Sequence, residues 1–262
     1  CGQGVRVELI VDVGNSNTVL GLTGAMGGWA AVWRMGTQRG EYGGEWSVMV
    51  DAHARRDGVD LAEVERVVIC SVVPVATAAL LDYARNWLHK PVLVVSSALE
   101  LDIRLGMENP EMVGVDRIAN AVAANQLVNG PAIVVDLGTA TKVEAISDAG
   151  VFLGGSIAPG IQVMMDALTS RTARLFTIPL RLPERAIGRN TVEAMQSGIV
   201  LGHVAMIERL VEQVGREIGE GEAEVLVTGG HAEAPDSPFR MLGRHEPMLT
   251  MNGIRRIAER NG

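Results

Sequence analysis

The chain has 262 residues and a formal net charge of −8. Hydrophobic residues make up 47% and charged residues 21%, which is the balance of a globular core under a solvated surface. An acidic chain lacks the broad basic surface that binding to a phosphate backbone requires. No apolar run approaches the roughly 20 residues that span a bilayer. We therefore expect neither a nucleic acid nor a membrane as partner.

Cysteine usage indicates a reducing compartment. Only two cysteines occur, Cys1 and Cys70. Two scattered cysteines give neither a disulfide framework nor a zinc-binding spacing. No signal peptide is recognisable ahead of the first predicted strand. The sequence therefore predicts a cytoplasmic protein.

The first half of the chain opens with a predicted antiparallel meander. A β-branched run ends in Asp12-Val-Gly14 and is followed by small polar residues. A second run at 18–23, a glycine-rich turn at 24–28 and a third run at 29–35 complete the meander. Later strands are predicted at 67–71 and 92–95.

The same order recurs in the second half. After a predicted helix from 116 to 129, stopped by Gly130-Pro131, a β-branched run ends in Asp136-Leu-Gly138. Runs at 141–147 and 151–156 follow, separated by a turn at 148–150. Two Asp-Gly turns could recur by chance in a glycine-rich chain, but matched flanks favour a repeat. We expect two α/β lobes of similar topology, residues 1–115 and 116–262.

The end of the chain adds a helix and a strand. Apolar residues from Val192 to Val214 follow a helical stripe, and Asn190 with Glu193 predicts a cap at its start. Core burial and a subunit interface explain this stripe equally well. A strand at 224–228 leads into Gly229-Gly230, which suits either close approach to an adenosine or an ordinary strand-to-helix turn.

The repeated Asp-x-Gly element indicates phosphate chemistry. A strand that ends in it places a carboxylate at the carboxyl edge of a sheet, where α/β proteins usually bind ligands. The glycine permits a tight turn whose N–H groups and small hydroxyls can face a phosphate. Neither copy is a Walker A loop. One such turn is a weak signal, whereas two that open similar halves indicate one nucleotide held from both sides.

Seven ordered segments carry a resemblance to a known family. They are Asp12-Val-Gly-Asn-Ser-Asn-Thr-Val19, Ser71-Val-Val-Pro74, Asn109-Pro110 with Gly114-Val-Asp-Arg117, Asp136-Leu-Gly-Thr-Ala-Thr141, Gly154-Gly-Ser-Ile-Ala-Pro-Gly160, Gly188-Arg-Asn-Thr-Val-Glu-Ala-Met-Gln-Ser-Gly198 and Thr228-Gly-Gly230. The pattern resembles the acetate and sugar kinase, heat-shock chaperone ATPase and actin superfamily. Within that superfamily it is similar to the type III pantothenate kinases over nearly the whole chain.

The resemblance implies a fold and an activity. The fold is α/β, with two similar ribonuclease H-like lobes, each a mixed five-stranded sheet with flanking helices, and the nucleotide in the cleft between them. The activity is ATP-dependent phosphorylation of pantothenate to 4'-phosphopantothenate, the first step of coenzyme A biosynthesis. The family also implies a homodimer, ATP with Mg²⁺, and a monovalent cation, K⁺ or NH₄⁺.

Residue roles follow from the same resemblance. Asp116 corresponds to the catalytic base, although spacing alone favours a helix cap there. Arg117 has a planar fork suited to a carboxylate or a phosphate. Asp12 is implied to hold Mg²⁺, directly or through water, and Asp136 the monovalent cation. The residues implied to bind ATP are Asp12, Val13, Gly14, Asn15, Ser16, Asn17, Thr18, Val19 and Thr139, and those implied to bind pantothenate are Met107, Gly114, Val115, Asp116, Arg117 and Thr191.

Two features depart from the family pattern. After Thr141 the family usually has Thr, an aromatic or aliphatic residue, and Asp, whereas this chain has Lys142, Val143 and Glu144. That lysine could pair with a phosphate or with Glu144, or obstruct the site. Met107 stands where family members often carry a Tyr that lines the pantothenate pocket.

The sequence leaves two other functions open. Accessory transcription factors share this family's sequence, so a non-catalytic regulator is the first. Phosphorylation of another small hydroxyl compound is the second. Retention of Asp12, Asp116 and Asp136 argues against the regulator, and Lys142 argues weakly for it.

Overall fold

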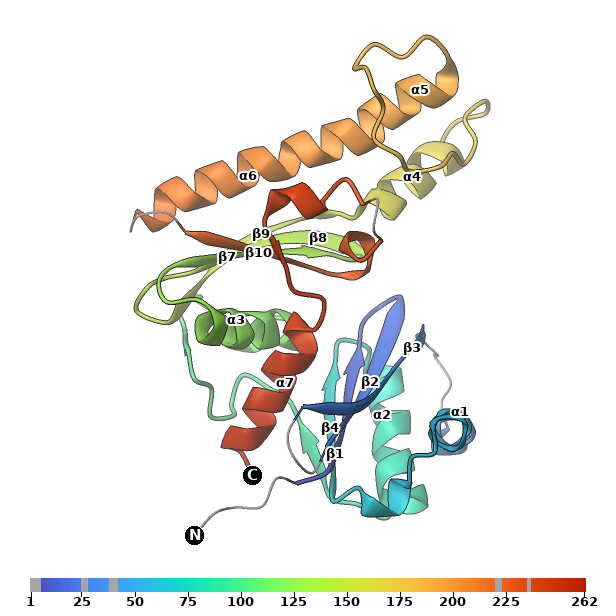
Figure 1. Ribbon diagram of the computed structural model, residues 1–262, viewed down its shortest axis with the longest axis vertical. Coiled ribbons are helices and arrows are strands. Elements are labelled where there is room, and N and C mark those ends of the chain that lie inside the picture. The colour runs from blue at the N-terminus through green and yellow to red at the C-terminus, as the bar shows by residue number, and fades with distance from the viewer. Residues whose placement is uncertain (1–5, 25–27, 38–41, 220–222, 235–236) are drawn as a thin grey trace. The chain divides into compact units, whose positions relative to one another are not determined.

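The structure is a computed structural model of the chain that describes residues 6–24, 28–37, 42–219, 223–234 and 237–262. By its internal contacts the chain forms two compact units. Unit 1 comprises residues 1–101, 109–122 and 250–262, and unit 2 comprises residues 102–108 and 123–249. Each unit is built on one β-sheet with its own helices (Figure 1).

The sheet of unit 1 has five strands in the order β3-β2-β1-β4-β5. They are β1 (Glu8–Val13), β2 (Asn17–Thr23), β3 (Trp29–Gly36), β4 (Arg66–Ser71) and β5 (Val92–Val94). The first three form an antiparallel meander, and β4 and β5 add in parallel to β1. This confirms the predicted strands. The predicted turn at 24–28 lies partly outside the described residues.

One face of this sheet is covered by α1 (Gly43–Asp57) and α2 (Pro74–Asp82), and α2 continues into the π-helical turn η2 (Tyr83–Trp87). Pro74 is the first residue of α2, where the missing N–H of proline costs no hydrogen bond. Leu9 and Val11 of β1 share a buried core with Trp46 of α1 and Leu80 of α2. Because side chains alternate along a strand, Ile10 and Asp12 point to the opposite face.

That opposite face receives the C-terminal helix α7 (Leu249–Arg260). Gly21 lies opposite Ile10 in the β1–β2 ladder, and a side chain at Gly21 would collide with Met251 of α7. Arg66 of β4 donates to the carbonyl oxygens of Ala258 at 2.8 Å and Asn261 at 2.9 Å. Its charge is balanced by Glu8, whose Oε1 lies 2.7 Å from the Arg66 Nε.

The first turns of α3 (Val115–Leu127) also belong to unit 1. Gly253 of α7 lies so close to Ala119 of α3 that an added Cβ would overlap the Ala119 carbonyl. Thr250 Oγ1 donates to Asn120 Oδ1 at 2.8 Å. The chain therefore returns to unit 1 at its end. A single boundary between residues 115 and 116 does not describe the two units, because unit 1 contains residues from both sides of it. The contacts of α7 with β4 and α3 join residues that are far apart in sequence.

The sheet of unit 2 repeats the order of unit 1 and adds one strand. Its order is β11-β10-β7-β8-β9-β6. The strands are β7 (Ala132–Leu137), β8 (Ala140–Ile146), β9 (Val151–Pro159), β10 (Glu224–Thr228), β11 (Arg244–His245) and β6 (Arg104–Leu105). The family resemblance implies five strands here. The sixth, β6, is only two residues long and pairs in parallel with β9, and so short a segment gives no periodic signal.

One face of this sheet is covered by α4 (Ile161–Ser170) and α6 (Gly202–Ile218). The short helix α5 (Thr191–Gln196) leads through the π-helical turn η4 (Ser197–Leu201) into α6 and extends beyond the sheet. Ile133 and Val135 of β7 share a buried core with Met195, Ile199 and Ile207. The predicted helical stripe is therefore accounted for by core packing. The predicted cap is confirmed, because Asn190 Oδ1 accepts the Glu193 N–H at 3.0 Å.

The repeat extends to fine detail. In the first meander a β-bulge lies between Leu22 and Thr23, and in the second it lies between Ala145 and Ile146. Both bulges occur at the end of the second strand, just before the turn to the third. The described residues contain no helix long and apolar enough to cross a membrane.

Candidate active site

Asp12 lies at the carboxyl end of β1, next to the β1–β2 hairpin. Its side chain is half-buried and points to the face of the sheet away from the α1–α2 core. Its cross-strand neighbours are Val19 on β2 and Cys70 on β4. An acidic oxygen therefore stands at the edge of a sheet where ligands of α/β proteins bind.

The hairpin beyond Asp12 exposes its three polar tip residues, Asn15, Ser16 and Asn17. The turn is closed by the Gly14 N–H, which donates to the Asn17 carbonyl at 3.0 Å. Thr37, just after β3, stabilises this turn through two hydrogen bonds. Its N–H donates to the Ser16 carbonyl at 2.9 Å, and its hydroxyl donates to the Gly14 carbonyl at 2.7 Å. The predicted phosphate donors at 15–17 are thus held in a fixed, open turn. Sequence reasoning missed Thr37, since only the pairing of β2 with β3 brings it there.

Thr18 and Val19, also predicted to contact ATP, are inside the protein. Thr18 has no exposed surface, and its Oγ1 lies 3.1 Å from Thr37 Oγ1. Val19 is 9% exposed. The expectation that the Thr18 hydroxyl faces a phosphate is corrected here: alternation along β2 turns this side chain inward. Thr18 supports the hairpin from within.

Asp116 lies in the first turn of α3, where the sequence predicts the catalytic base. Its Oδ1 accepts the Arg117 N–H at 2.9 Å, and both side chains are half-buried. An acidic group in the first turn also suits the helix dipole. A Cβ on Gly114 would lie 2.6 Å from this Oδ1. The Asp116 carboxylate can take this position only because residue 114 is a glycine. The spacing of Gly114 and Asp116 therefore has a steric reason.

In unit 2, Asp136 occupies the position on β7 that Asp12 occupies on β1. Lys142 stands directly opposite on β8 and donates from Nζ to Asp136 Oδ2 at 2.8 Å. The two side chains are only 13% and 15% exposed. The sequence left a phosphate or Glu144 as the partner of Lys142, whereas the structure pairs it with Asp136. Glu144, two residues further along β8, is fully buried.

This ion pair does not fit a monovalent cation at Asp136. A second unit charge about 4 Å from the lysine ammonium would meet a repulsion of about 4 kcal/mol at an effective dielectric constant of 20. That repulsion is as large as the whole binding free energy of a ligand held with a millimolar Kd, about 4 kcal/mol. An ion that binds weakly cannot overcome it.

Thr139 is exposed at the tip of the β7–β8 hairpin. Its carbonyl accepts the N–H of Gly160 at 2.9 Å, and Gly160 immediately precedes α4. A Cβ on Gly160 would lie 2.6 Å from the Thr139 carbonyl oxygen, so only glycine allows this approach. The hairpin thus meets the N-terminus of a helix, a place that favours anions.

The paired glycines after β10 have a packing role. Gly229 has a φ of 93°, and a Cβ there would lie 2.6 Å from the backbone of Leu137 on β7. This contact accounts for the glycine without a ligand. The sequence left two interpretations of these glycines open, close approach to an adenosine or an ordinary strand-to-helix turn. Packing against Leu137 is sufficient to explain Gly229 without the adenosine.

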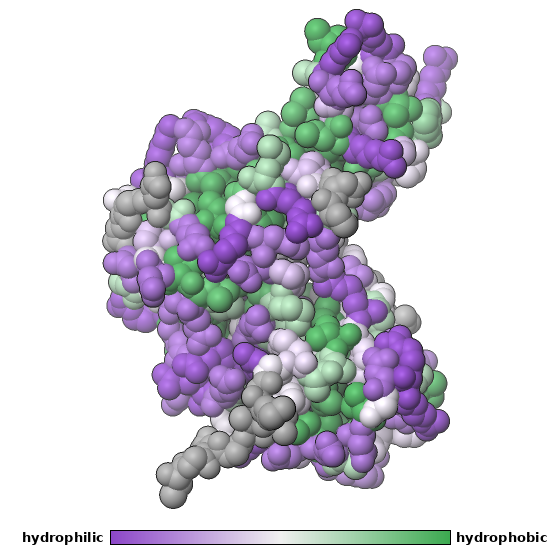
Figure 2. Space-filling view, viewed as in Figure 1, coloured by the Kyte–Doolittle hydropathy of each residue, from purple (hydrophilic) through white to green (hydrophobic). Residues whose placement is uncertain are grey.

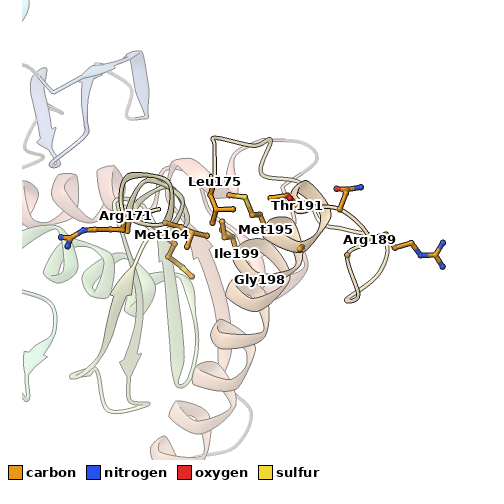
Figure 3. Close-up of a pocket in the computed structure, with 13 residues that line it drawn as sticks. Met164, Arg171, Leu175, Arg189, Thr191, Met195, Gly198 and Ile199 are labelled. Carbon is orange, nitrogen blue, oxygen red and sulfur yellow. The ribbon is translucent and has the colours of Figure 1, made fainter. Parts of the chain in front are cut away.

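Met107 and Thr191, both implied to bind pantothenate, lie in different parts of unit 2. Met107 packs beside Gly154 of β9. Thr191 is exposed at the start of α5 and lines an open cavity of about 920 Å³ between α4, α5, η4 and the segment that joins α4 to α5. Figure 3 shows Met164, Leu175, Met195 and Ile199 gathered at this cavity. The lining is mainly apolar, and Met107 is not part of it.

Among the described residues no group of three or more His, Cys, Asp or Glu side chains could hold a metal ion by itself. A magnesium site made of one carboxylate, waters and substrate phosphates does not require such a group, since Mg²⁺ usually keeps several waters. Asp12 fits this kind of site.

The fold and these two strand-end aspartates define a class of protein. Two β-sheets with the same strand order form a fold that this chain shares with actin-like sugar kinases. A putative 2-dehydro-3-deoxygalactonokinase from Sinorhizobium meliloti has a similar fold, with a TM-score of 0.59, 14% identity and 96% of each chain covered. A putative Baf family transcriptional activator from Campylobacter jejuni is also similar, with a TM-score of 0.57 and 19% identity over 97% of this chain and 98% of that one.

The sequence comparisons identify the family within this class. The family model for type III pantothenate kinase matches residues 8–213. A type III pantothenate kinase from Moorella thermoacetica is 41% identical over 97% of this chain and 99% of its own length. One from Thermomicrobium roseum is 40% identical over 96% of each. The chain belongs to the type III pantothenate kinase family.

Proposed function

We propose that this protein transfers the terminal phosphoryl group of ATP to the hydroxyl group of pantothenate, giving 4'-phosphopantothenate and ADP, the first step of coenzyme A biosynthesis. The main support is the similarity to type III pantothenate kinases over 97% of the chain. The half-buried carboxylate of Asp116 at the start of α3 supplies a base for this chemistry.

At phosphorus the reaction forms one bond and breaks one. The hydroxyl oxygen of pantothenate attacks the γ-phosphorus, the bond from that phosphorus to the bridging oxygen breaks, and ADP leaves with the electron pair. Asp116 accepts the hydroxyl proton. Such transfer depends mainly on positioning and on electrostatic stabilisation. The hydrogen bond from the Arg117 N–H and the space left by Gly114 fix the Asp116 carboxylate for this role.

Both hairpins contribute to ATP binding in this proposal. The exposed tip at 15–17 offers donors to phosphate oxygens, and Thr139 contributes from unit 2. Asp12 would hold Mg²⁺, directly or through water. When bound, that ion neutralises charge on the phosphates. A monovalent cation at Asp136 is left out of the proposal because Lys142 takes its place.

Pantothenate is assigned the remaining predicted residues. The guanidinium of Arg117 suits its carboxylate, and Met107, Gly114, Val115 and Thr191 are proposed as further contacts.

We also propose a cytoplasmic homodimer. Its support is a set of exposed apolar side chains on the segment that carries α4 and α5, namely Val163, Phe176, Leu182 and Ile187, and Figure 2 shows apolar surface there. Sedimentation of the purified chain tests the dimer.

A coupled ADP-release assay with and without pantothenate tests the activity, and mass spectrometry identifies the product. We expect ADP release to depend on pantothenate and Asp116→Asn to abolish it while the circular dichroism spectrum stays unchanged. An active Asp116→Asn protein would remove that residue from the role of base. A panel of other small hydroxyl compounds tests the substrate, and nucleotide binding without any turnover would favour the regulator.

A further inference from the structure

Lys142 is an unusual residue for this chain. Lysine occurs at only two positions, 90 and 142, although Lys and Arg together number 23. The chain thus carries its positive charge almost entirely on arginine, whose guanidinium is a planar fork. Lysine instead presents a compact ammonium group, a point charge on a flexible stem. At position 142 this group lies mostly buried against a strand-end aspartate.

The fold itself does not require this lysine. In unit 1 the equivalent aspartate, Asp12, faces Val19 across the same antiparallel pair of strands. In unit 2 the residue opposite Asp136 is Lys142. Two hairpins of the same design therefore differ in charge at one cross-strand position. A role in the site explains this difference better than a role in the sheet.

We propose that the Lys142 ammonium is a built-in replacement for a monovalent cation, so that this enzyme binds ATP without K⁺ or NH₄⁺. The inference rests on the proposed function, which makes the Asp136 hairpin part of the ATP site. An ammonium group held 2.8 Å from Asp136 Oδ2 supplies the single positive charge that K⁺ or NH₄⁺ would bring. Because it is covalently attached, it is present at every salt composition and the carboxylate is not open to an exchanging ion.

The structure also suggests how to recreate a cation site. A shorter polar side chain at 142 would uncover the Asp136 carboxylate and leave a hydroxyl oxygen beside it. Lys142→Thr is therefore the informative variant. Lys142→Met removes the charge but keeps the length, so it lacks both the ammonium and the added oxygen. Lys90→Met is the matched control, because the Lys90 ammonium donates to the Ala62 carbonyl at 3.0 Å and lies outside both Asp-x-Gly hairpins.

The first measurement is calorimetric binding of a non-hydrolysable ATP analogue with Mg²⁺, in KCl or in tetramethylammonium chloride of equal ionic strength. We expect the wild-type and Lys90→Met proteins to give the same Kd in both salts. Lys142→Thr should bind the analogue on the order of tenfold more weakly in tetramethylammonium and recover in KCl. Lys142→Met should be weak in both salts. A wild-type Kd that improves severalfold in KCl would overturn the proposal.

The second measurement needs no variant to be active. Thallium(I), which substitutes for K⁺, is titrated into each protein and followed by thallium NMR. The wild-type protein should show no saturable broadening of the signal, and Lys142→Thr should show broadening that K⁺ reverses. Saturable, K⁺-reversible binding to the wild type would contradict the proposal even if Lys142→Thr fails to fold.

These outcomes distinguish a failure of the cation inference from a failure of the proposed function. If the wild-type protein binds the analogue equally in both salts but never phosphorylates pantothenate, the pantothenate assignment fails and the cation inference stands. If it phosphorylates pantothenate only when K⁺ or NH₄⁺ is present, the assignment stands and the cation inference fails.

Discussion

Asp12 and Asp136 hold the same place in the two sheets, at the carboxyl end of the central strand and on the face turned away from the core formed with the helices of each unit. What differs is the residue across the ladder, Val19 in one case and Lys142 in the other. Only Asp136 has a basic side chain directly opposite on the neighbouring strand. We therefore propose different tasks for the two carboxylates, a metal ion at Asp12 and a fixed internal charge at Asp136.

Replacing Asp12 should separate metal-dependent from metal-independent nucleotide binding. Asp12→Asn keeps the shape of the side chain but removes the charge that attracts Mg²⁺. We expect kcat to fall by about a hundredfold or more. Calorimetry should show weaker binding of Mg²⁺-ATP analogue and unchanged binding of the analogue in EDTA. Asp51→Asn on the surface of α1 is the control, and equal effects of the two substitutions would argue against the assigned role.

Gly114→Ala should impair turnover without unfolding the protein. The added methyl group would lie 2.6 Å from Asp116 Oδ1, so the carboxylate has to leave its position in the first turn of α3. Because a displacement of about 1 Å can cost about a hundredfold in rate, we expect a large fall in kcat with a nearly unchanged melting temperature. Gly202→Ala in α6 is the matched control, since the nearest atom to its added methyl group lies at an ordinary 3.8 Å. Full activity of Gly114→Ala would show that the position of Asp116 is not critical.

Local signals in the sequence were sufficient to predict most of the framework. The Asp12 and Asp136 strands, the two meanders and the Asn190 cap depend on residues within a few positions of one another, and the structure confirms them. The inward turn of Thr18 could have been found from the alternation of side chains along a strand. The polar character of residues 15–18 instead favours phosphate binding by all four side chains, which the structure does not bear out for Thr18.

Features that depend on distant contacts were beyond sequence reasoning. The return of α7 to unit 1 depends on two contacts between distant parts of the chain. Arg66 donates to the Ala258 carbonyl, and Gly253 packs against Ala119. Neither contact gives a periodic pattern in the sequence. The pairing of Lys142 with Asp136 required the register of β7 and β8, which fixes the residue directly opposite each strand-end aspartate. A one-residue shift would have moved Lys142 to the other face of the sheet.

The contact between α7 and α3 predicts a stability effect far from any proposed ligand. Gly253→Ala would force a methyl group into the Ala119 carbonyl, so the helices must separate. We expect a loss of about 1–3 kcal/mol in the free energy of unfolding, the usual cost of overpacking. Denaturation by urea measures it. Gly215→Ala in α6 is the control, because its methyl group would meet only Ile133 Cδ1 at 3.8 Å, and a loss as large as that of Gly253→Ala would contradict the steric argument.

The last prediction concerns pH and His203, which is 1% exposed in the core of unit 2. Its Nε2 lies 2.9 Å from Thr141 Oγ1, and its Nδ1 lies 3.1 Å from Met164 Sδ. Burial, and to a lesser extent the nearby His231, lower the pKa of His203 below its ordinary value. Thr141 corresponds to Thr18 of the first hairpin, so each hairpin is supported from inside by a buried threonine with a hydrogen-bonding partner.

Because this pKa is lower in the folded than in the unfolded protein, the unfolded chain binds more protons as the pH falls. The free energy of unfolding should therefore be full above the unfolded pKa of about 6.5 and decline below it, by at most about 1.4 kcal/mol per pH unit for this one group. Urea denaturation between about pH 8 and pH 5 measures the slope. His203→Gln should reduce the slope. His231, whose pKa burial also lowers, should account for part of the remainder; an unaltered slope in His203→Gln would show that His203 does not titrate in this range.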